Sequence, residues 1–221
     1  MDPETIASKK RELRRQLRAH RAATYAGEHG ASRRAREAQQ LLEHASPLIA
    51  SVEAAVAAAR AAGTAMPLVA AYHPTPTEAD VMLLAHRLAQ AGARLVFPAA
   101  EAGTELEWIA WDGVSDFQDS PGRGFGKEPR GERLGTGALH EAMLVLAPAV
   151  AVDRSATRIG HGAGYYDRAL TTIPEGAQVV AVIHPSELLA EGTLVRGEHD
   201  VPISRVLTAD GLVSLITSES A

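Results

Sequence analysis

Residues 158–168 combine glycines, cations and a carboxylate in the short stretch RIGHGAGYYDR. Glycines at 160, 162 and 164 leave alternating backbone positions without a Cβ atom, so the chain can adopt positive φ angles and point successive N–H groups at one anion. Arg158 and His161 add side-chain donors to the same turn. This pattern predicts a phosphate-binding turn.

A helix is expected directly after this turn, over the segment AGYYDRAL. The free N–H groups at its N-terminus would favour an anion at the same place. Asp167 would lie one turn into the helix, where its carboxylate could reach a magnesium ion bound to the phosphates. The glycines alone also fit a strand-to-helix connection that binds nothing, and the string is neither a Walker A motif nor G-x-G-x-x-G.

Four cations, Lys10, Arg14, Arg18 and Arg21, recur at spacings of four, four and three in a predicted helix over residues 5–25. Residues at this spacing share one helix face, so the cations could form a stripe directed at a polyphosphate. From spacing alone, a solvated basic face is the commoner outcome.

The composition is that of an ordinary globular protein. The chain has 221 residues, of which 46% are hydrophobic and 22% charged, and its net charge is −5. We expect one domain over residues 1–221 and no general attraction to nucleic acid or to anionic membranes. The absence of cysteine excludes disulfides, thiolate metal sites and a cysteine nucleophile. The charged N-terminus and the lack of a long apolar run favour a cytoplasmic protein without a signal peptide or membrane span, and we expect a monomer.

The elements that would position these residues follow a strand–helix alternation after an N-terminal helical segment. Predicted helices cover 5–25, 32–45, 47–62 and 77–91; predicted strands cover 68–72, 94–97, 106–111, 143–148, 178–184, 206–208 and 212–215; a polar, glycine-rich loop is expected over 112–135. This order predicts an α/β fold with an open, mostly parallel sheet flanked by helices in a Rossmann-like, three-layer arrangement.

Ligands bind at the carboxyl edge of such a sheet. Four segments should meet there: residues 72–80, Phe97-Pro98, the glycine turn and His184-Pro185. Among the histidines, His73, His161, His184 and His199 fall on this edge, but their spacing predicts no dedicated metal cage.

The longer string VLAPAVAVDRSATRIGHGAGYYDR resembles the C-terminal signature of the 5-formyltetrahydrofolate cyclo-ligase family, also called 5,10-methenyltetrahydrofolate synthetase. Shorter motifs extend the resemblance from Lys10 to about Leu212. The resemblance implies an ATP- and Mg²⁺-dependent cyclisation of 5-formyltetrahydrofolate to 5,10-methenyltetrahydrofolate, in which ATP phosphorylates the formyl oxygen. No protein nucleophile is required, which agrees with the absence of cysteine.

The family's K-x-x-L-R motif corresponds here to residues 10–14, KRELR, and implies that Lys10 and Arg14 contact the nucleotide phosphates. The implied ATP-binding residues are Lys10, Arg14, Arg158, Gly160, His161, Gly162, Ala163, Gly164, Tyr165 and Tyr166. Of these, Arg158, His161 and Lys10 are the expected catalytic residues, acting on charge at the phosphates. Asp167, and Asp200 after His199, are the implied magnesium ligands; His199-Asp200 alone would usually be a turn.

The segment that begins at Tyr72 is similar to the family's Y-x-x-x-x-x-E-V-D-T, which lines the folate pocket. The implied folate-binding residues are Tyr72, Thr75, Glu78, Asp80, Phe125 and Tyr166. Phe125 opens FGKEP, a shortened form of the family's F-G-I-P-E-P, and could stack on the pterin or benzoyl ring. Alternatively, Glu78 and Asp80 are carboxylates favoured by the first turn of a helix, and Phe125 is a loop anchor.

Two residues depart from the family signature. His161 stands where Tyr or Arg is usual, and Ala163 where Gly or Lys is usual. Ala163 can serve the turn with a negative φ, and His161 remains a donor that is strongest when protonated. We therefore expect His161 to line the site and to make activity depend on pH.

Two other classes of protein remain alternatives. A non-catalytic relative could bind folate or nucleotide as a regulator, although the retained Lys10, Arg158 and Asp167 argue against it. An enzyme acting on sugar phosphates or coenzyme A esters could share the sheet, but it would lack the GYYDR string and would carry a glutamate or lysine nucleophile at a strand end.

Overall fold

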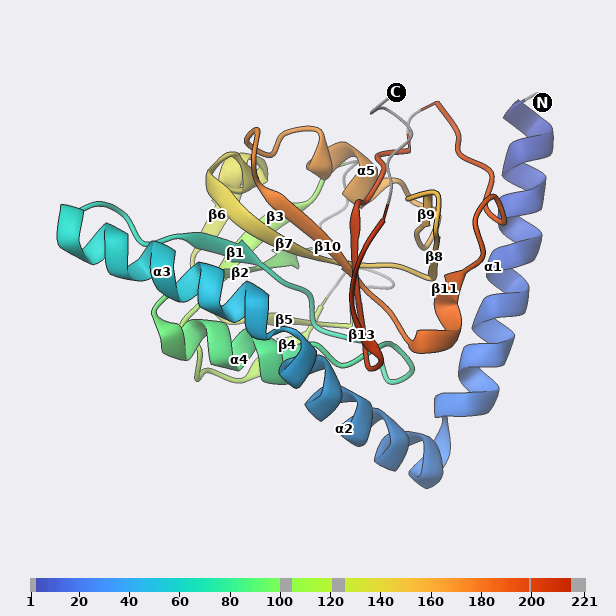
Figure 1. The fold of residues 1–221 in the computed structure, drawn as a ribbon, viewed down its shortest axis with the longest axis horizontal. Helices are drawn as coiled ribbons and strands as arrows, with labels where there is room; N and C mark the ends of the chain where they lie inside the picture. The colour runs from blue at the N-terminus through green and yellow to red at the C-terminus, as the bar shows by residue number, and fades with distance from the viewer. Residues whose placement is uncertain (1–2, 100–104, 121–125, 199, 216–221) are drawn as a thin grey trace.

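The computed structural model describes residues 3–99, 105–120, 126–198 and 200–215. An eight-stranded sheet in the order β13-β12-β10-β7-β1-β2-β3-β6 forms its centre (Figure 1). Its strands are β1 (Leu68–Ala70), β2 (Arg94–Ala99), β3 (Glu107–Trp111), β6 (Arg133–Gly135), β7 (Ala142–Pro148), β10 (Gln178–Val182), β12 (Arg205–Thr208) and β13 (Gly211–Ser214).

The five middle strands, β12, β10, β7, β1 and β2, are parallel, whereas β13 at one edge and β3 and β6 at the other pair in antiparallel fashion. Every residue of β1 is buried, and so are the last five residues of β7. Continuous apolar runs of this kind are typical of parallel strands covered on both faces. The predicted open, mostly parallel α/β sheet is therefore confirmed.

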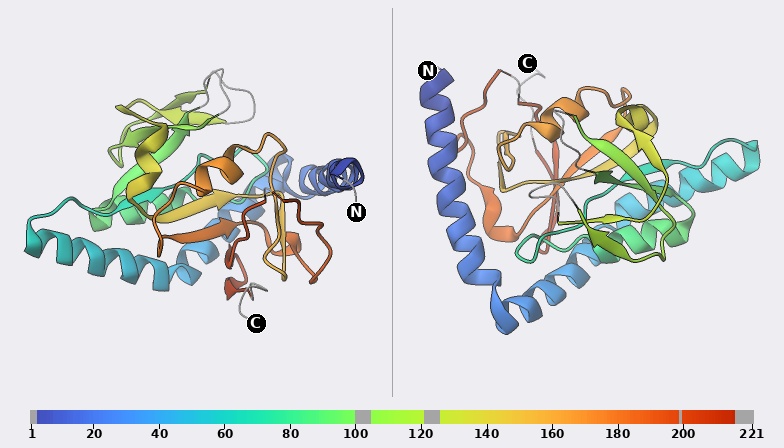
Figure 2. Two further views of the ribbon diagram at one scale, coloured as in Figure 1. Left: turned by 90° about the horizontal axis from the view of Figure 1, so that it is seen from above. Right: turned by 180° about the vertical axis from the view of Figure 1, so that it is seen from behind.

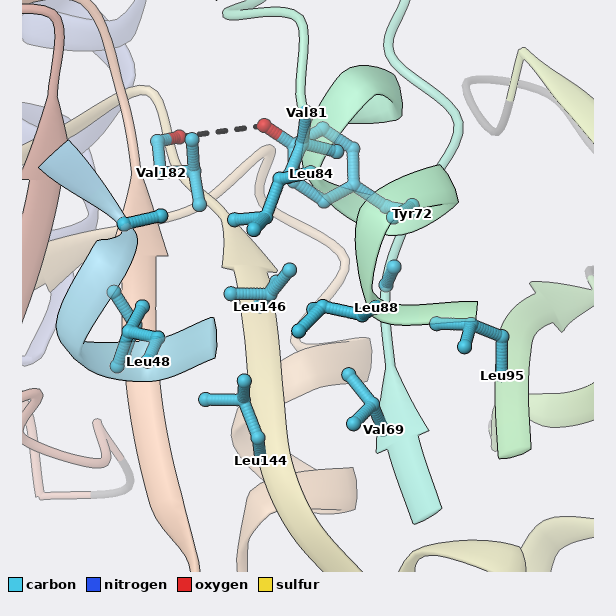
Figure 3. Close-up of a cluster of buried hydrophobic side chains, with 14 of the residues drawn as sticks. Leu48, Val69, Tyr72, Val81, Leu84, Leu88, Leu95, Leu144, Leu146 and Val182 are labelled. Atoms are coloured by element: carbon cyan, nitrogen blue, oxygen red, sulfur yellow. Dashed lines mark hydrogen bonds between the residues drawn. The ribbon is translucent and has the colours of Figure 1, made fainter. Parts of the chain in front are cut away.

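Helices cover both faces of the sheet (Figures 1 and 2). The helices are α1 (Pro3–Tyr25), α2 (Gly27–His44), α3 (Ser46–Ala62), α4 (Met82–Ala91), α5 (Tyr165–Leu170) and the 3₁₀ helices η1 (Thr136–Glu141) and η2 (Pro185–Glu187). Apolar residues of α2, α3 and α4 pack on one face, and those of η1 and α5 pack on the other. Figure 3 shows Leu48 of α3 and Leu84 and Leu88 of α4 against Val69 and Leu144 of the sheet.

Helix α1 lies to one side of these layers (Figure 1), beside a small sheet of β11 (Leu188–Leu189), β8 (Ala151–Asp153) and β9 (Arg158–Ile159). Its Leu13 and Leu17 pack against the buried Val150, Ala151 and Ile159. Leu13 and Leu17 thus anchor α1 to the hairpin that carries Arg158.

Two predicted helix starts were wrong. Helix α2 begins at Gly27 rather than at residue 32. Helix α4 begins at Met82 rather than at residue 77, because residues 75–80 turn back on themselves: Glu78 Oε2 accepts the Thr75 N–H at 2.7 Å, and Asp80 Oδ1 accepts the Met82 N–H at 3.0 Å.

The predicted loop over 112–135 also holds regular structure: β6 joins the main sheet, and β4 (Phe117–Asp119) pairs with β5 (Lys127–Pro129). These strands are only three residues long, too short for a period-two pattern to be detected.

Among the described residues, no single helix is long and apolar enough to cross a membrane, and only α2 and α3 together, bent by 54°, reach that length and composition.

Candidate active site

A pocket of about 460 Å³ lies where β1, β2 and β7 end and the glycine turn begins. Its lining comes from five parts of the chain that are distant in sequence. The lining residues are Lys10, Arg14, Arg18, Tyr72, His73, Glu78, Pro98, Pro148, Arg158, Gly160, His161, Gly162, Ala163, Gly164, Tyr165, Tyr166, Asp167 and Asp200. The structure thus brings together all ten residues expected to bind nucleotide and both expected magnesium ligands.

The glycine turn uses its glycines in two ways. Gly162 (φ 112°) and Gly164 (φ 69°) adopt the left-handed conformation that favours glycine. The prediction for Gly160 was wrong, because its φ is not positive. A Cβ atom at Gly160 would lie 2.7 Å from Arg158 Nη1, so this glycine makes room for the guanidinium instead. The φ of Ala163 is not positive, so an alanine fits this position of the turn.

Helix α1 presents three cations to this turn. Arg14 Nε donates to the Gly160 carbonyl at 2.8 Å, and Arg18 Nη2 donates to the His161 carbonyl at 2.9 Å. Lys10 forms an ion pair with Asp200. Groups more than a hundred residues apart in sequence therefore meet at one wall of the pocket.

The fourth cation of the predicted stripe, Arg21, does not face the pocket. Its side chain is 4% exposed and donates to Glu187 at 2.7 and 2.8 Å and to the Ala149 carbonyl at 2.9 Å. Burial disfavours the charged form, but the hydrogen bonds and the charge of Glu187 outweigh it, so the pKa of Arg21 is raised. Arg21 is a buried structural cation, and its predicted place in a phosphate-facing stripe was wrong.

Both expected metal ligands are held by cations. Arg158, whose side chain is 3% exposed, donates from Nη2 to Asp167 Oδ1 at 2.6 Å. Asp200 accepts from Lys10 and, at 2.6 Å, from the Gly197 N–H. Among the residues that the structure describes, no three His, Asp or Glu side chains cluster as a ready metal site. Each carboxylate is therefore already neutralised by a neighbouring cation.

Glu78 and His161 also meet in the pocket, where His161 Nε2 and Glu78 Oε1 are 2.8 Å apart. Arg18 Nη2 lies 3.3 Å from His161 Nδ1, and because a guanidinium can only donate, Nδ1 is the acceptor and Nε2 carries the proton shared with Glu78. Burial of Glu78 would raise its pKa, but the hydrogen bond from His161, the Thr75 N–H and Arg21 lower it to about 2. Glu78 is therefore a buried carboxylate that stays ionised.

The other expected folate ligands divide into three groups. Tyr72 and Tyr166 line the pocket, but the Tyr72 hydroxyl is directed into the fold, 3.1 Å from the Ala79 carbonyl and 3.4 Å from the Val182 carbonyl (Figure 3). Thr75 and Asp80 do not line the pocket; Asp80 lies 3.4 Å from Arg34 instead. Phe125 lies outside the described residues.

His73 and His184 lie near the edge that the sequence predicted, with different roles. His73 lines the pocket, and its Nδ1 is buried without a hydrogen-bond partner. Burial, with the nearby charge of Lys127, lowers the pKa of His73, so its ring is neutral. His184 does not line the pocket; it is buried below it. His199 lies outside the described residues.

Comparison with known proteins places this pocket in a family. Residues 6–209 match the model of the 5-formyltetrahydrofolate cyclo-ligase family. A curated 5-formyltetrahydrofolate cyclo-ligase from Mycolicibacterium smegmatis is 38% identical over 156 residues, which are 66% of this chain and 76% of that protein.

Two solved structures share the fold. The 5,10-methenyltetrahydrofolate synthetase of Aquifex aeolicus superposes with a TM-score of 0.70 at 22% identity, over 96% of this chain and 95% of that one. That of Mycoplasma pneumoniae gives 0.63 at 18% identity, over 90% and 98%. With the matched signature and the sheet, these findings show that the chain belongs to the 5-formyltetrahydrofolate cyclo-ligase family.

Proposed function

We propose that this protein catalyses the ATP-dependent cyclisation of 5-formyltetrahydrofolate to 5,10-methenyltetrahydrofolate, with release of ADP and phosphate. The observation that carries the proposal is the union, in one pocket, of the glycine turn, the cations of α1 and the Glu78 segment. The family membership supports the same activity.

The chemistry requires few protein groups. The formyl oxygen is a poor leaving group, so ATP phosphorylates it; N10 then attacks the activated carbon, the N10 proton is released and phosphate departs. Phosphoryl transfer depends on positioning and on neutralising charge over the phosphate oxygens. Lys10, Arg14, Arg158 and the N–H groups of the glycine turn would do this, with His161 as a further donor.

Asp167 and Asp200 would hold magnesium in the proposed reaction, because both carboxylates line the pocket. Mg²⁺ usually binds through one or two carboxylates together with phosphate oxygens and water, rather than through a complete protein cage. The carboxylates of Asp167 and Asp200, which both line the pocket, agree with that mode. The ion would neutralise charge on the phosphates, and Asp167 and Asp200 would hold it.

The folate would lie on the side of the pocket formed by Tyr72, Glu78 and Tyr166. The ionised Glu78 accepts hydrogen bonds only, so it suits the N–H donors of a pterin ring. The neutral His73 offers a ring face and an unpaired nitrogen in the same wall. We further propose that the chain acts as one domain, as a monomer and in the cytoplasm.

The decisive experiment follows the absorbance of the methenyl product after 5-formyltetrahydrofolate is added to the purified protein, with and without ATP and Mg²⁺. We expect product only when both are present. Folate binding without turnover would instead indicate the non-catalytic binding protein.

A further inference from the structure

A second cluster of polar side chains, outside the pocket lining, is not used by the proposed mechanism. It is centred on His184, which follows β10 and is 1% exposed. The ring of Tyr25 from α1 stacks on the imidazole, with centroids 3.6 Å apart and planes inclined by 15°. Glu37 of α2 and Glu187 of η2 are also buried.

Both ring nitrogens of His184 face groups that accept hydrogen bonds. Nδ1 lies 2.7 Å from Glu37 Oε2, and Nε2 lies 3.1 Å from the Thr77 carbonyl oxygen. A carbonyl oxygen can only accept, and so can an ionised carboxylate. Burial raises the pKa of Glu37, but hydrogen bonds from His184 and Arg33 outweigh it and lower the value, so Glu37 is ionised. A neutral imidazole has a single N–H, and only the doubly protonated ring can donate to both partners.

Two carboxylates, each paired with a guanidinium group, lie around His184. Glu37 and Glu187 face it, the latter by accepting the His184 backbone N–H at 3.0 Å. Arg21 binds Glu187, and Arg33, at the surface, binds Glu37 at 2.8 Å. The Tyr25 hydroxyl is neutral, because burial and the charge of Glu37 raise its pKa.

The backbone connects the contact between His184 and Thr77 to the pocket. Thr77 directly precedes Glu78, whose carboxylate lines the pocket and bonds to His161. Helix α2 holds this segment a second time, because Arg34 binds the Pro76 carbonyl and lies 3.4 Å from Asp80. Glu37 is three residues further along α2, so one helix restrains residues 76–80 through Arg34 directly and through His184.

We propose that His184 is a positioning residue: as a buried imidazolium it bridges Glu37 to the Thr77 carbonyl and so fixes Glu78 in the folate side of the pocket. The substrate part of this inference rests on the proposed function. The charge state of His184 and the restraint on residues 75–78 do not depend on it.

The first test compares His184→Phe, which keeps the stacking on Tyr25 but removes both donors, with His184→Gln, which keeps one donor group. The matched control is His29→Gln, at an exposed position of α2. Losing a hydrogen bond from a charged donor should raise the KM for 5-formyltetrahydrofolate about tenfold or more in His184→Phe. The KM for ATP should stay within about twofold, and His184→Gln should fall between His184→Phe and the native protein. Equal rises in both KM values, or no rise in either, would overturn the positioning role.

Two further measurements need no turnover. In the native protein at neutral pH, the ¹⁵N resonances of the two His184 ring nitrogens should lie close together, as in an imidazolium; two widely separated resonances would show a neutral ring and refute the proposal.

The second measurement is hydrogen exchange of the Thr75 amide, whose N–H donates to Glu78 Oε2. Exchange of this amide should be faster in His184→Phe than in the native protein and unchanged in His29→Gln. If His184→Phe does not fold, His184→Gln should show the faster exchange. Unchanged exchange would contradict the restraint. If the native protein forms no methenyl product while both measurements give the expected results, the proposed function fails and the restraint by His184 stands.

Discussion

His161 and Glu78 are 83 residues apart in the chain, yet His161 Nε2 and Glu78 Oε1 are 2.8 Å apart in the pocket. This contact joins the glycine turn to the segment that follows β1. Because Arg18 donates to the carbonyl of His161 and lies beside its Nδ1, the ring is held between a carboxylate and a guanidinium. His161, one of the two residues that depart from the family signature, thus links the glycine turn to the Glu78 segment.

His161→Gln should weaken ATP binding, because the variant loses the imidazole that joins the glycine turn to Glu78 and that offers a donor beside the expected phosphate site. ATP affinity measured for the native protein and for His161→Gln tests this. The exposed His20→Gln in α1 is the control. Equal ATP affinities for native protein and His161→Gln would show that His161 takes no part.

Asp167→Asn should lower Mg²⁺-dependent turnover at least about tenfold. The amide cannot supply the negative charge that magnesium requires, but it is nearly isosteric and can still accept from Arg158, so the melting temperature should change little. Turnover as a function of Mg²⁺ concentration, together with thermal unfolding, tests both expectations. Asp116→Asn, at an exposed position, is the control. Native activity and native magnesium dependence in Asp167→Asn would exclude this carboxylate as a metal ligand.

Arg14→Ala should raise the KM for ATP about tenfold or more. The variant loses one or two charge-assisted hydrogen bonds to phosphate, each worth about 1.5–3 kcal/mol. It also removes the donor to the Gly160 carbonyl. Arg11→Ala, an exposed change in the same helix, should leave the value unchanged. An Arg14→Ala enzyme with the native KM for ATP would place the nucleotide elsewhere.

Glu78 should contribute to stability above its ordinary pKa of 4.5 and lose that contribution as the pH falls from about 4.5 toward about 2, because its pKa is lowered in the folded state. In this pH range the Glu78 carboxyl group binds a proton in the unfolded chain but stays ionised in the folded chain. The loss should be on the order of 1–3 kcal/mol. Urea unfolding across this range should give a shallower decline for Glu78→Gln than for the exposed-site control Glu175→Gln. Identical declines would contradict the stabilisation of ionised Glu78.

Arg21→Met should destabilise the protein by about 3–5 kcal/mol, because it leaves the buried Glu187 carboxylate without its cation. Adding Glu187→Leu should recover part of the loss, since no isolated charge then remains buried. Denaturant unfolding of the two single variants and the double variant gives the coupling energy. Additive losses would show that the pair is not coupled.

Local patterns in the sequence predicted the elements that carry a clear periodicity or a distinctive motif. The apolar run before Pro148 predicted β7, and the alternating glycines predicted the turn that follows Arg158. The spacing of Lys10 and Arg14 predicted one face of α1, which the structure places against that turn. Their roles toward ATP and magnesium stay predictions.

The remaining features depend on contacts between distant segments, which no local pattern records. Arg21 has the same spacing as Arg18, but it is buried because Glu187, 166 residues away, lies within hydrogen-bond distance. The Thr-Glu pair at residues 77 and 78 looked like a helix start, yet the Glu78 carboxylate folds back on Thr75 and delays α4 to Met82. The bridging contacts of His184 likewise join α2 to the segment before α4 and have no signature of their own.

The ion pair of Lys10 with Asp200 spans 190 residues of sequence. During synthesis the first helix therefore leaves the ribosome long before Asp200 does, and the part of the pocket wall that Lys10 and Asp200 form is incomplete until residue 200 has emerged. Contacts of such long range form late in folding, because the entropy of closing the intervening chain must be overcome first. Formation of this ion pair would thus report that synthesis has passed Asp200.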